Sequence, residues 1–257
     1  MKLDFTPAPG AAGYRSMVVA HAAMETRLLL RNGEQVLLAL IIPLLLLVGG
    51  AEAGGVIDLG TGRRIDVLTP GVMALAVMSS AFTSLAIATA YERRYGVLKR
   101  LGASPLPRSG LLAGKVLSLL ALEAIQLGVI GVTALLLGWR PSLLGADVGS
   151  ALLLIVIGTW AFAALGMLMA GRLRAEATLA AANLVYVVLL IAGAVVIPVS
   201  SYPEASQRVV TALPSGALAE GLREVLSTAG LDWSRIAVLA AWGAVATALT
   251  VRIFSWE

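Results

Sequence analysis

The sequence predicts an all-α, polytopic membrane protein with six transmembrane helices. The observations behind this fold class are that 59% of the 257 residues are hydrophobic, that only 13% are charged, and that the mean hydropathy is +0.91. Soluble domains contain about 45 to 50% apolar and about 25% charged residues, so this excess cannot be buried in one water-soluble core. Because each spanning helix needs about 20 apolar residues, the length also excludes a large enzyme domain outside the membrane.

The first predicted unit, residues 1–33, is a cytoplasmic N-terminus. Residues 14–31 mix apolar and charged side chains in a helix-permissive order, which is typical of an amphipathic helix lying at the membrane interface. We therefore expect an interfacial elbow helix before the first span. The alternative is that this stretch simply extends the first span.

Residues 34–257 are predicted to form a six-span transmembrane domain. Its apolar runs fall at residues 36–50, 67–91, 115–137, 149–171, 178–197 and 236–254. With the N-terminus inside, 13 of the 19 lysine and arginine residues lie on the cytoplasmic side. The positive-inside rule then predicts a multi-pass plasma-membrane protein with both termini cytoplasmic.

The segment between the fifth and sixth spans, residues 198–233, is too apolar for a free loop. Pro198, Pro203 and Pro214 divide it into short pieces. We expect an extracellular re-entrant or short-helix region, with two short outer-face helices at about 204–213 and 215–228.

Several enzyme classes are excluded by residue content. The chain has no cysteine and a single histidine, His21, which rules out thiol nucleophiles and multi-histidine metal sites. The nearest approach to an ATP-binding P-loop, SGLLAGKV at 109–116, has serine at the first glycine position and valine at the Mg²⁺-binding hydroxyl position. A serine protease needs a base, and the simplest role of His21 is that of a surface partner for Glu25 one turn on. We expect no catalytic, cofactor-binding or metal-binding residue in this chain.

The cytoplasmic loop 92–114, between the second and third spans, has an informative order. A charged helical stretch leads to Gly102, Pro105 and Pro107 force a turn, and the chain re-enters the membrane at Lys115. An ordinary topology-fixing loop needs basic residues but no such order.

This order resembles the permeases of type-2 ATP-binding-cassette (ABC) transporters, a largely export-directed family. The family pattern E-R-x-x-G-[TV]-[LM]-[KE]-R-L-x-[AS]-[ST]-P is matched by Glu92, Arg93, Gly96, Val97, Leu98, Lys99, Arg100, Leu101, Ala103, Ser104 and Pro105. The resemblance covers nearly the whole chain. It implies a coupling helix that docks on a separate ATPase subunit, with ATP and Mg²⁺ bound by that partner, and a unit of two permeases, identical or homologous, with two ATPases.

A helix over 92–101 is expected to transmit motion between the two subunits, because ATP-driven closure acts on the permease only through contacts that differ between states. The residues expected to carry this coupling are Glu92, Arg93, Arg94, Gly96, Leu98, Lys99, Arg100, Leu101 and Pro105. The four basic residues would pair with partner carboxylates, while Leu98 and Leu101 would fill an apolar notch.

Polar residues inside the spans form a candidate substrate path. Glu123 lies about 12 Å along the third span from Lys115, and Gln126 and Thr133 share its face. The second span adds Ser80, Thr83 and Ser84, and the fifth adds Asn183, Tyr186 and Gly193. A carboxylate inside the membrane is a functional candidate by default, and the alternative for Glu123 and for the other residues is interhelical hydrogen bonding and close packing.

Together with the resemblance to type-2 ABC permeases, these observations predict a permease subunit of an ABC exporter in the lipid membrane, moving a hydrophobic or amphipathic, drug- or lipid-like substrate. Nucleic acid is not expected as a partner, because the basic residues lie at span ends rather than on an aromatic-studded surface. Two alternatives remain open. One is a proton-coupled secondary transporter that uses Glu123, and the other is a non-transporting membrane scaffold.

Overall fold

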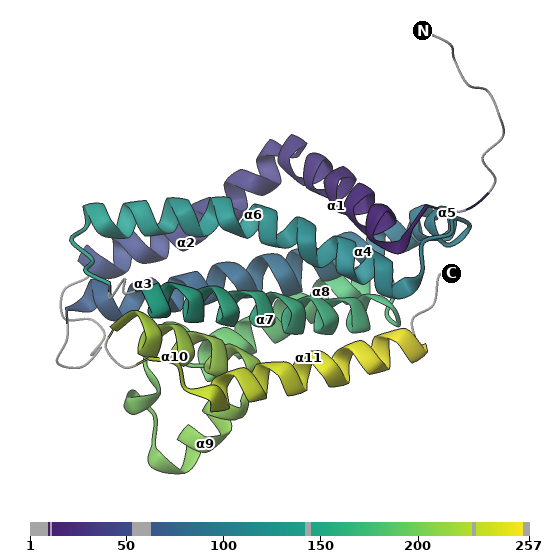
Figure 1. The fold of residues 1–257 in the computed structure, drawn as a ribbon. Coiled ribbons are helices and arrows are strands. Elements are labelled where there is room, and N and C mark those ends of the chain that lie inside the picture. Colours follow the sequence, from purple (N-terminus) through teal and green to yellow (C-terminus); the bar gives the residue numbers. More distant parts are fainter. Residues whose placement is uncertain (1–9, 11, 53–62, 142–144, 228–229, 254–257) are drawn as a thin grey trace, which may run out of the picture.

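The computed structural model describes residues 10, 12–52, 63–141, 145–227 and 230–253, and these are largely helical (Figure 1). The elements are α1 (Tyr14–Arg31), α2 (Gly33–Glu52), α3 (Arg64–Met78), η1 (Ser79–Ser84), α4 (Leu85–Arg94), α5 (Val97–Gly102), α6 (Arg108–Leu136), α7 (Gly145–Ala170), α8 (Ala175–Ala192), η2 (Val199–Ser201), α9 (Glu204–Ala212), α10 (Pro214–Ser227) and α11 (Trp233–Ile253). No strand occurs in the part of the chain that the structure describes. The all-α prediction is confirmed.

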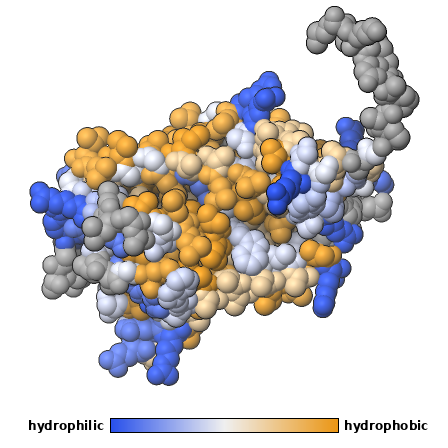
Figure 2. All heavy atoms as spheres, in the orientation of Figure 1, coloured by the Kyte–Doolittle hydropathy of each residue, from blue (hydrophilic) through white to orange (hydrophobic). Residues whose placement is uncertain are grey.

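Five segments are long and apolar enough to cross a membrane: Arg64–Arg94, Arg108–Leu136, Asp147–Ala170, Ala175–Ala192 and Trp233–Ile253. The first predicted span corresponds to a shorter apolar stretch, Ala39–Glu52, within α2. Apolar side chains cover much of the face shown in Figure 2, as expected for helices that face lipid. The polytopic membrane fold is therefore confirmed with five candidate spans, while the first of the six predicted spans stays a prediction. The predicted end of the last span, residue 254, lies outside the described residues.

The helix predicted at 14–31 is separate from the first span. The chain leaves the helical conformation at Asn32 between α1 and α2, and Figure 1 shows the two helices meeting at an angle. One face of α1, including Val18 and Ala22, is buried, and α1 packs along α6. The alternative of a plain extension is wrong, while the interfacial position of α1 stays a prediction.

The start of α1 and the end of α11 lie at the same end of the bundle as α5 (Figure 1). Tyr14 approaches Gly110 near the start of α6, and Arg108 donates a hydrogen bond of 3.1 Å to the carbonyl oxygen of Val251. Two cytoplasmic termini require this arrangement. Which membrane side this end faces stays a prediction.

The core of the bundle is a rod made of α3, η1 and α4. All residues from Leu68 to Met78 are buried, and the rod packs against α2, α6, α7, α8 and α10. Its middle, Ser79–Ser84, is a π-helix, in which hydrogen bonds run from residue i to residue i+5 rather than i+4. The rod therefore carries one wide turn at its centre.

The two short helices before α11 have nearly the predicted bounds, with α9 over Glu204–Ala212 and α10 over Pro214–Ser227. The predicted end of the second, residue 228, lies outside the described residues. Rather than lying on the outer face, α10 is buried between α3, α7 and α11. Its first residue, Pro214, lines a cavity with Phe82 and Trp242, which lie near the middle of their spans. α10 thus reaches into the bundle, while a re-entrant region that opens to the outside stays a prediction.

The fifth span is shorter than predicted. The sequence predicts a span to residue 197, but α8 ends at Ala192, and Ala194 adopts a left-handed backbone conformation with φ of 52°. At Gly193 a side chain would overlap Ser215 and the backbone of Leu189. The helix therefore ends where the start of α10 packs closely against it, a contact that hydropathy does not reveal.

Candidate functional site

The predicted coupling helix is two helices joined by a turn. α4 ends at Arg94 and α5 begins at Val97, with Gly96 between them at φ of 71°. Glycine adopts this left-handed conformation without the steric cost that other residues meet. The expectation of one continuous helix over 92–101 is wrong, because Gly96 redirects the chain. Pro105 is exposed in the non-helical turn before α6, where the sequence predicts a turn.

One side of α5 is anchored in the protein's own core. The Leu98 side chain has 0% exposure, and Leu101 is half-buried against the same core. Leu98 is therefore not presented to a partner in this conformation, which corrects the expected apolar contact. The exposed residues around α5 are Tyr95, Val97, Lys99 and Arg100. Amphipathic burial explains the difference, since a short helix must place one apolar side inward.

The two arginines at the end of α4 contact the region where α8 begins. Arg94 forms an ion pair with Glu176, and Arg93 donates a hydrogen bond to the carbonyl oxygen of Leu173. Both contacts lie within this chain, so these residues are not reserved for a partner carboxylate. Exposed pairs of this kind contribute only about 0 to 1 kcal/mol, so exchanging Glu176 for another partner has a low cost.

A buried charge cluster joins α1, α4 and α6. The Lys115 ammonium lies 3.1 Å from Glu25 Oε1 and 2.9 Å from the Glu92 carboxylate, and the Lys115 side chain has 1% exposure. Glu92 thus interacts inside the protein in this conformation, and its role in coupling to an ATPase stays a prediction. Sequence reasoning treated Lys115 only as a topology marker, because nothing in the sequence shows that Glu25 folds back on it.

His21 lies next to this cluster. Its Nε2 atom is 3.6 Å from Glu25 Oε1 without forming a hydrogen bond, and the ring is buried rather than on the surface. A side chain at Gly114 would overlap the His21 ring, so α1 and α6 approach closely here. Burial lowers the pKa of the imidazole below its usual value, although Glu25 opposes this shift and Lys115 adds to it.

Within the membrane, Glu123 is buried between α6 and α7. The Thr159 hydroxyl donates a hydrogen bond to Glu123 Oε2, and no described residue donates to Oε1. Thr133, on the predicted polar stripe, bonds only to the Val129 carbonyl of its own helix. Glu123 lines neither of the two cavities inside the bundle considered below, so its place in a substrate path stays a prediction.

Two predicted path residues form a bridge between helices. Ser80 Oγ donates to Gln126 Oε1 at 2.7 Å, and Gln126 Nε2 donates to the Ala39 carbonyl oxygen at 3.0 Å. These bonds join η1, α6 and α2. For this pair the structure favours the alternative of interhelical hydrogen bonding.

The remaining path residues do not converge on one surface. Ser84 and Ser80 line a cavity of about 210 Å³ between α1, α2, the central rod and α6. Asn183 is exposed on α8 and bonds to its own helix, while Tyr186 is half-buried on the same helix. A second, apolar cavity of about 380 Å³ lies between η1, α7, α8, α10 and α11. The structure thus brings Ser80, Ser84 and Gln126 together and leaves Asn183 apart.

The helical architecture and the α4–α5–α6 segment agree with one family. The model of the ABC-2 type transporter family matches residues 16–227, which run from α1 through the last residue of α10. The chain belongs to this family. No curated protein matches the chain. Members of the family are membrane permease domains that lack ATPase motifs and associate with an ABC ATPase subunit.

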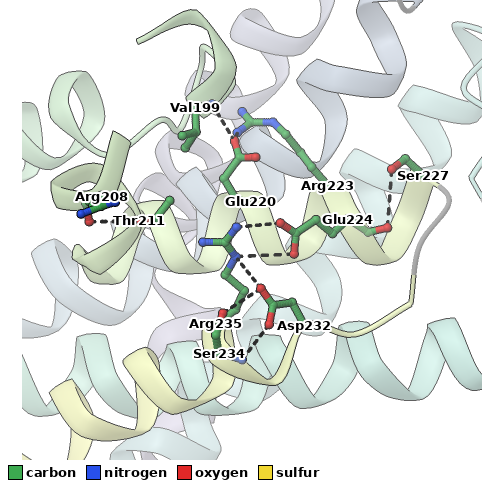
Figure 3. Close-up of polar contacts among 10 residues, drawn as sticks. All are labelled: Val199, Arg208, Thr211, Glu220, Arg223, Glu224, Ser227, Asp232, Ser234 and Arg235. Carbon is green, nitrogen blue, oxygen red and sulfur yellow. Dashed lines mark hydrogen bonds and ion pairs between the residues drawn. The ribbon is translucent and has the colours of Figure 1, made fainter. Parts of the chain in front are cut away.

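At the opposite end of the permease from α5, Arg223 of α10 forms a buried clamp that the sequence did not reveal. Its guanidinium donates to the carbonyl oxygens of Ala194 and Val195 at 2.6 Å each and of Val67 at 3.2 Å. It also pairs with Glu220 at 2.6 Å (Figure 3). One side chain thus joins α10, α3 and the segment after α8. The positive-inside count alone places Arg223 on the outer side as a surface charge.

Two further contacts extend the clamp. The Val199 amide donates to Glu220 Oε1 at 3.0 Å, and Arg235 pairs with Glu224 at 2.8 Å, as Figure 3 shows. These contacts connect α10 with η2 and with the start of α11. α10 of the permease is therefore held by charge-assisted bonds on two sides.

Proposed function

We propose that this permease exports a hydrophobic or amphipathic molecule from the cell, driven by ATP hydrolysed on a separate ATPase subunit. The observation that carries the proposal is the arrangement of α5. This helix exposes Val97, Lys99 and Arg100 at one end of the bundle, while Leu98 anchors it in the core. Such a helix offers both ionic and apolar contacts to a partner.

The route from α5 into the membrane is short. α5 follows α4 after one turn, and Glu92 of α4 is bound through Lys115 to α6 and α1. A displacement of α5 by the ATPase therefore acts on three membrane-associated helices together. An ATP-dependent partner can shift the permease between states only if its contacts with α5 differ in those states.

A second permease copy, identical or homologous, completes the proposed unit. α8 is the least covered of the long spans, and it exposes Leu184, Val187, Val188 and Ile191 along one side. An apolar face of this kind suits contact with another membrane helix or with lipid. The proposed location is the plasma membrane, with α5 and both termini on the cytoplasmic side.

The proposal is tested by reconstituting the permease with its ATPase and measuring copurification and ATP-dependent export. Val97→Asp, on the exposed side of α5, should reduce ATPase retention and export by about tenfold or more, because an interface that buries the new carboxylate without a partner loses about 1.4 kcal/mol or more. Val209→Asp is the matched control, since Val209 is exposed on α9 at the other end of the molecule. Equal export by both variants would show that α5 does not carry the coupling.

A proton-coupled secondary transporter predicts a different dependence. Its transport would stop when the proton gradient is dissipated, even with ATP and the ATPase present. The ABC exporter should continue under those conditions. The non-transporting scaffold predicts no substrate movement under either condition.

A further inference from the structure

The cavity of about 210 Å³ between α1, α2, the central rod and α6 has one charged end and apolar walls. Its walls include Leu28, Leu29, Val36, Leu85, Leu119 and Leu122, and its charged end is formed by Glu25, Glu92 and Lys115. Ser80, Ser84 and Ser118 also line it. The cavity is therefore amphipathic.

The carboxylates at the charged end of the cavity outnumber the cations. Glu25 and Glu92 contribute two carboxylates, and Lys115 contributes one ammonium group. The other residues that line the cavity are uncharged. Lys115 Nζ lies 2.9 Å from both oxygens of Glu92, but only the contact with Oε1 has hydrogen-bond geometry, so the buried Oε2 has no aligned donor. His21 is the adjacent titratable group, and burial lowers its pKa, which favours the neutral ring. When both carboxylates are ionised, the cluster carries one excess negative charge.

An excess charge in a buried site is costly unless an opposite charge or a proton neutralises it. The apolar walls would accept a hydrocarbon or aromatic body, which buries apolar surface on binding. An anionic head would meet the excess carboxylate, and a neutral molecule would leave it uncompensated. A bare metal ion is disfavoured, because no group of three or more His, Cys, Asp or Glu side chains among the described residues is placed to hold one.

We propose that this cavity binds a lipophilic monocation, a molecule with one protonated amine and an apolar body, with the amine directed at Glu92. The site supplies a substrate class for the exporter and in that sense rests on the proposed function. Binding itself requires neither ATP nor the ATPase, so the site can be tested on the permease alone.

The test uses three probes with the same chain, namely hexylamine, hexanol and hexanoate, titrated into the permease in neutral maltoside micelles. Calorimetric titration gives their dissociation constants, and thermal shifts provide a second measure, since a ligand of the folded state raises its stability. The wild type should bind hexylamine at least about tenfold more tightly than hexanol, the ratio expected for one charge-assisted hydrogen bond. Hexanoate should bind most weakly. Equal affinities for the three probes would overturn the proposal.

Glu92→Gln removes the excess charge and keeps the size of the side chain, so it should reduce the preference for hexylamine to less than about threefold. Glu176→Gln is the matched control, because Glu176 is an exposed carboxylate at the start of α8, and it should keep the wild-type preference. If Glu92→Gln does not fold, Glu25→Gln tests the same charge balance, and Ser84→Leu should weaken all three probes by occupying the cavity. An unchanged preference in Glu92→Gln or Glu25→Gln would overturn the proposal.

Failure of the site and failure of export are distinguishable. Selective hexylamine binding without ATP-dependent amine export supports the site and contradicts its use in export. ATP-dependent export of another molecule by a permease that does not prefer hexylamine supports the exporter and overturns the site.

Discussion

Replacing Arg223 with methionine should strongly destabilise the permease. The guanidinium donates to three carbonyl oxygens, at 2.6, 2.6 and 3.2 Å, and pairs with Glu220. Methionine keeps similar length but removes all five donors, leaving Glu220 without its cation. Removing one partner of a buried ion pair costs about 3 to 5 kcal/mol. For a protein of about 250 residues this corresponds to a decrease of about 6 to 20 °C in the unfolding midpoint.

The assay is thermal unfolding of purified permease in detergent, followed by size-exclusion chromatography of the heated samples. Arg208→Met is the matched control, because Arg208 is exposed on α9 and surface substitutions change stability by about 0.5 kcal/mol or less. Arg223→Lys should fall between the two, since a single ammonium cannot reproduce the planar set of guanidinium donors. If the unfolding midpoints of Arg223→Met and Arg208→Met differ by less than about 2 °C, the clamp does not stabilise α10.

Four further outcomes follow from the structure. Gly114→Ala should lower the unfolding midpoint by displacing the His21 ring, and an unchanged midpoint would contradict the close packing of α1 on α6. Because the folded-state pKa of His21 is lowered, its contribution to stability is present above about pH 6.5 and lost as the pH falls through the folded-state pKa. His21→Gln should therefore make the unfolding midpoint less dependent on pH in this range. The same pH dependence in His21→Gln and the wild type would show that His21 does not contribute. Single cysteines at Ser104 and Ser206 should react with impermeant reagents from opposite sides of the membrane, whereas labelling from one side would refute the predicted topology. If Glu123 lies on the substrate path, Glu123→Gln should alter transport or its pH dependence, whereas an unchanged pH profile would leave Glu123 a structural role against Thr159.

The sequence predicted the helices well because their hydropathy and breaker residues are local signals. The segment before α11 is an example, since Pro203 and Pro214 define the starts of α9 and α10 to within one residue. The depth of α10 could not be predicted, because its position depends on contacts with α3, α7 and α11. The end of α8 was missed for the same reason.

The candidate site was predicted less well, because sequence position does not show which way a charge faces. Lys115 marks a span end in the sequence, yet it is fully buried between Glu25 and Glu92, residues that are 67 positions apart from each other. Leu98 belongs to the predicted partner surface, yet it lies in the core once Gly96 has turned the chain. Long-range pairing of this kind requires the tertiary structure.

The wide turn Ser79–Ser84 also sets the angular phase of everything that follows it in the second span. A π-turn contains one residue more than the α-helical turn it replaces, and one residue corresponds to about 100° of rotation about the helix axis. If these six residues rewound into a regular α-helix with none of them removed, the part of the rod after them would turn by about 100°, and Glu92 would leave the cluster around Lys115. Removing one residue from the turn would instead restore a regular helix and leave Glu92 in phase with Lys115. The wide turn of this permease is therefore part of the register between the membrane core and α5.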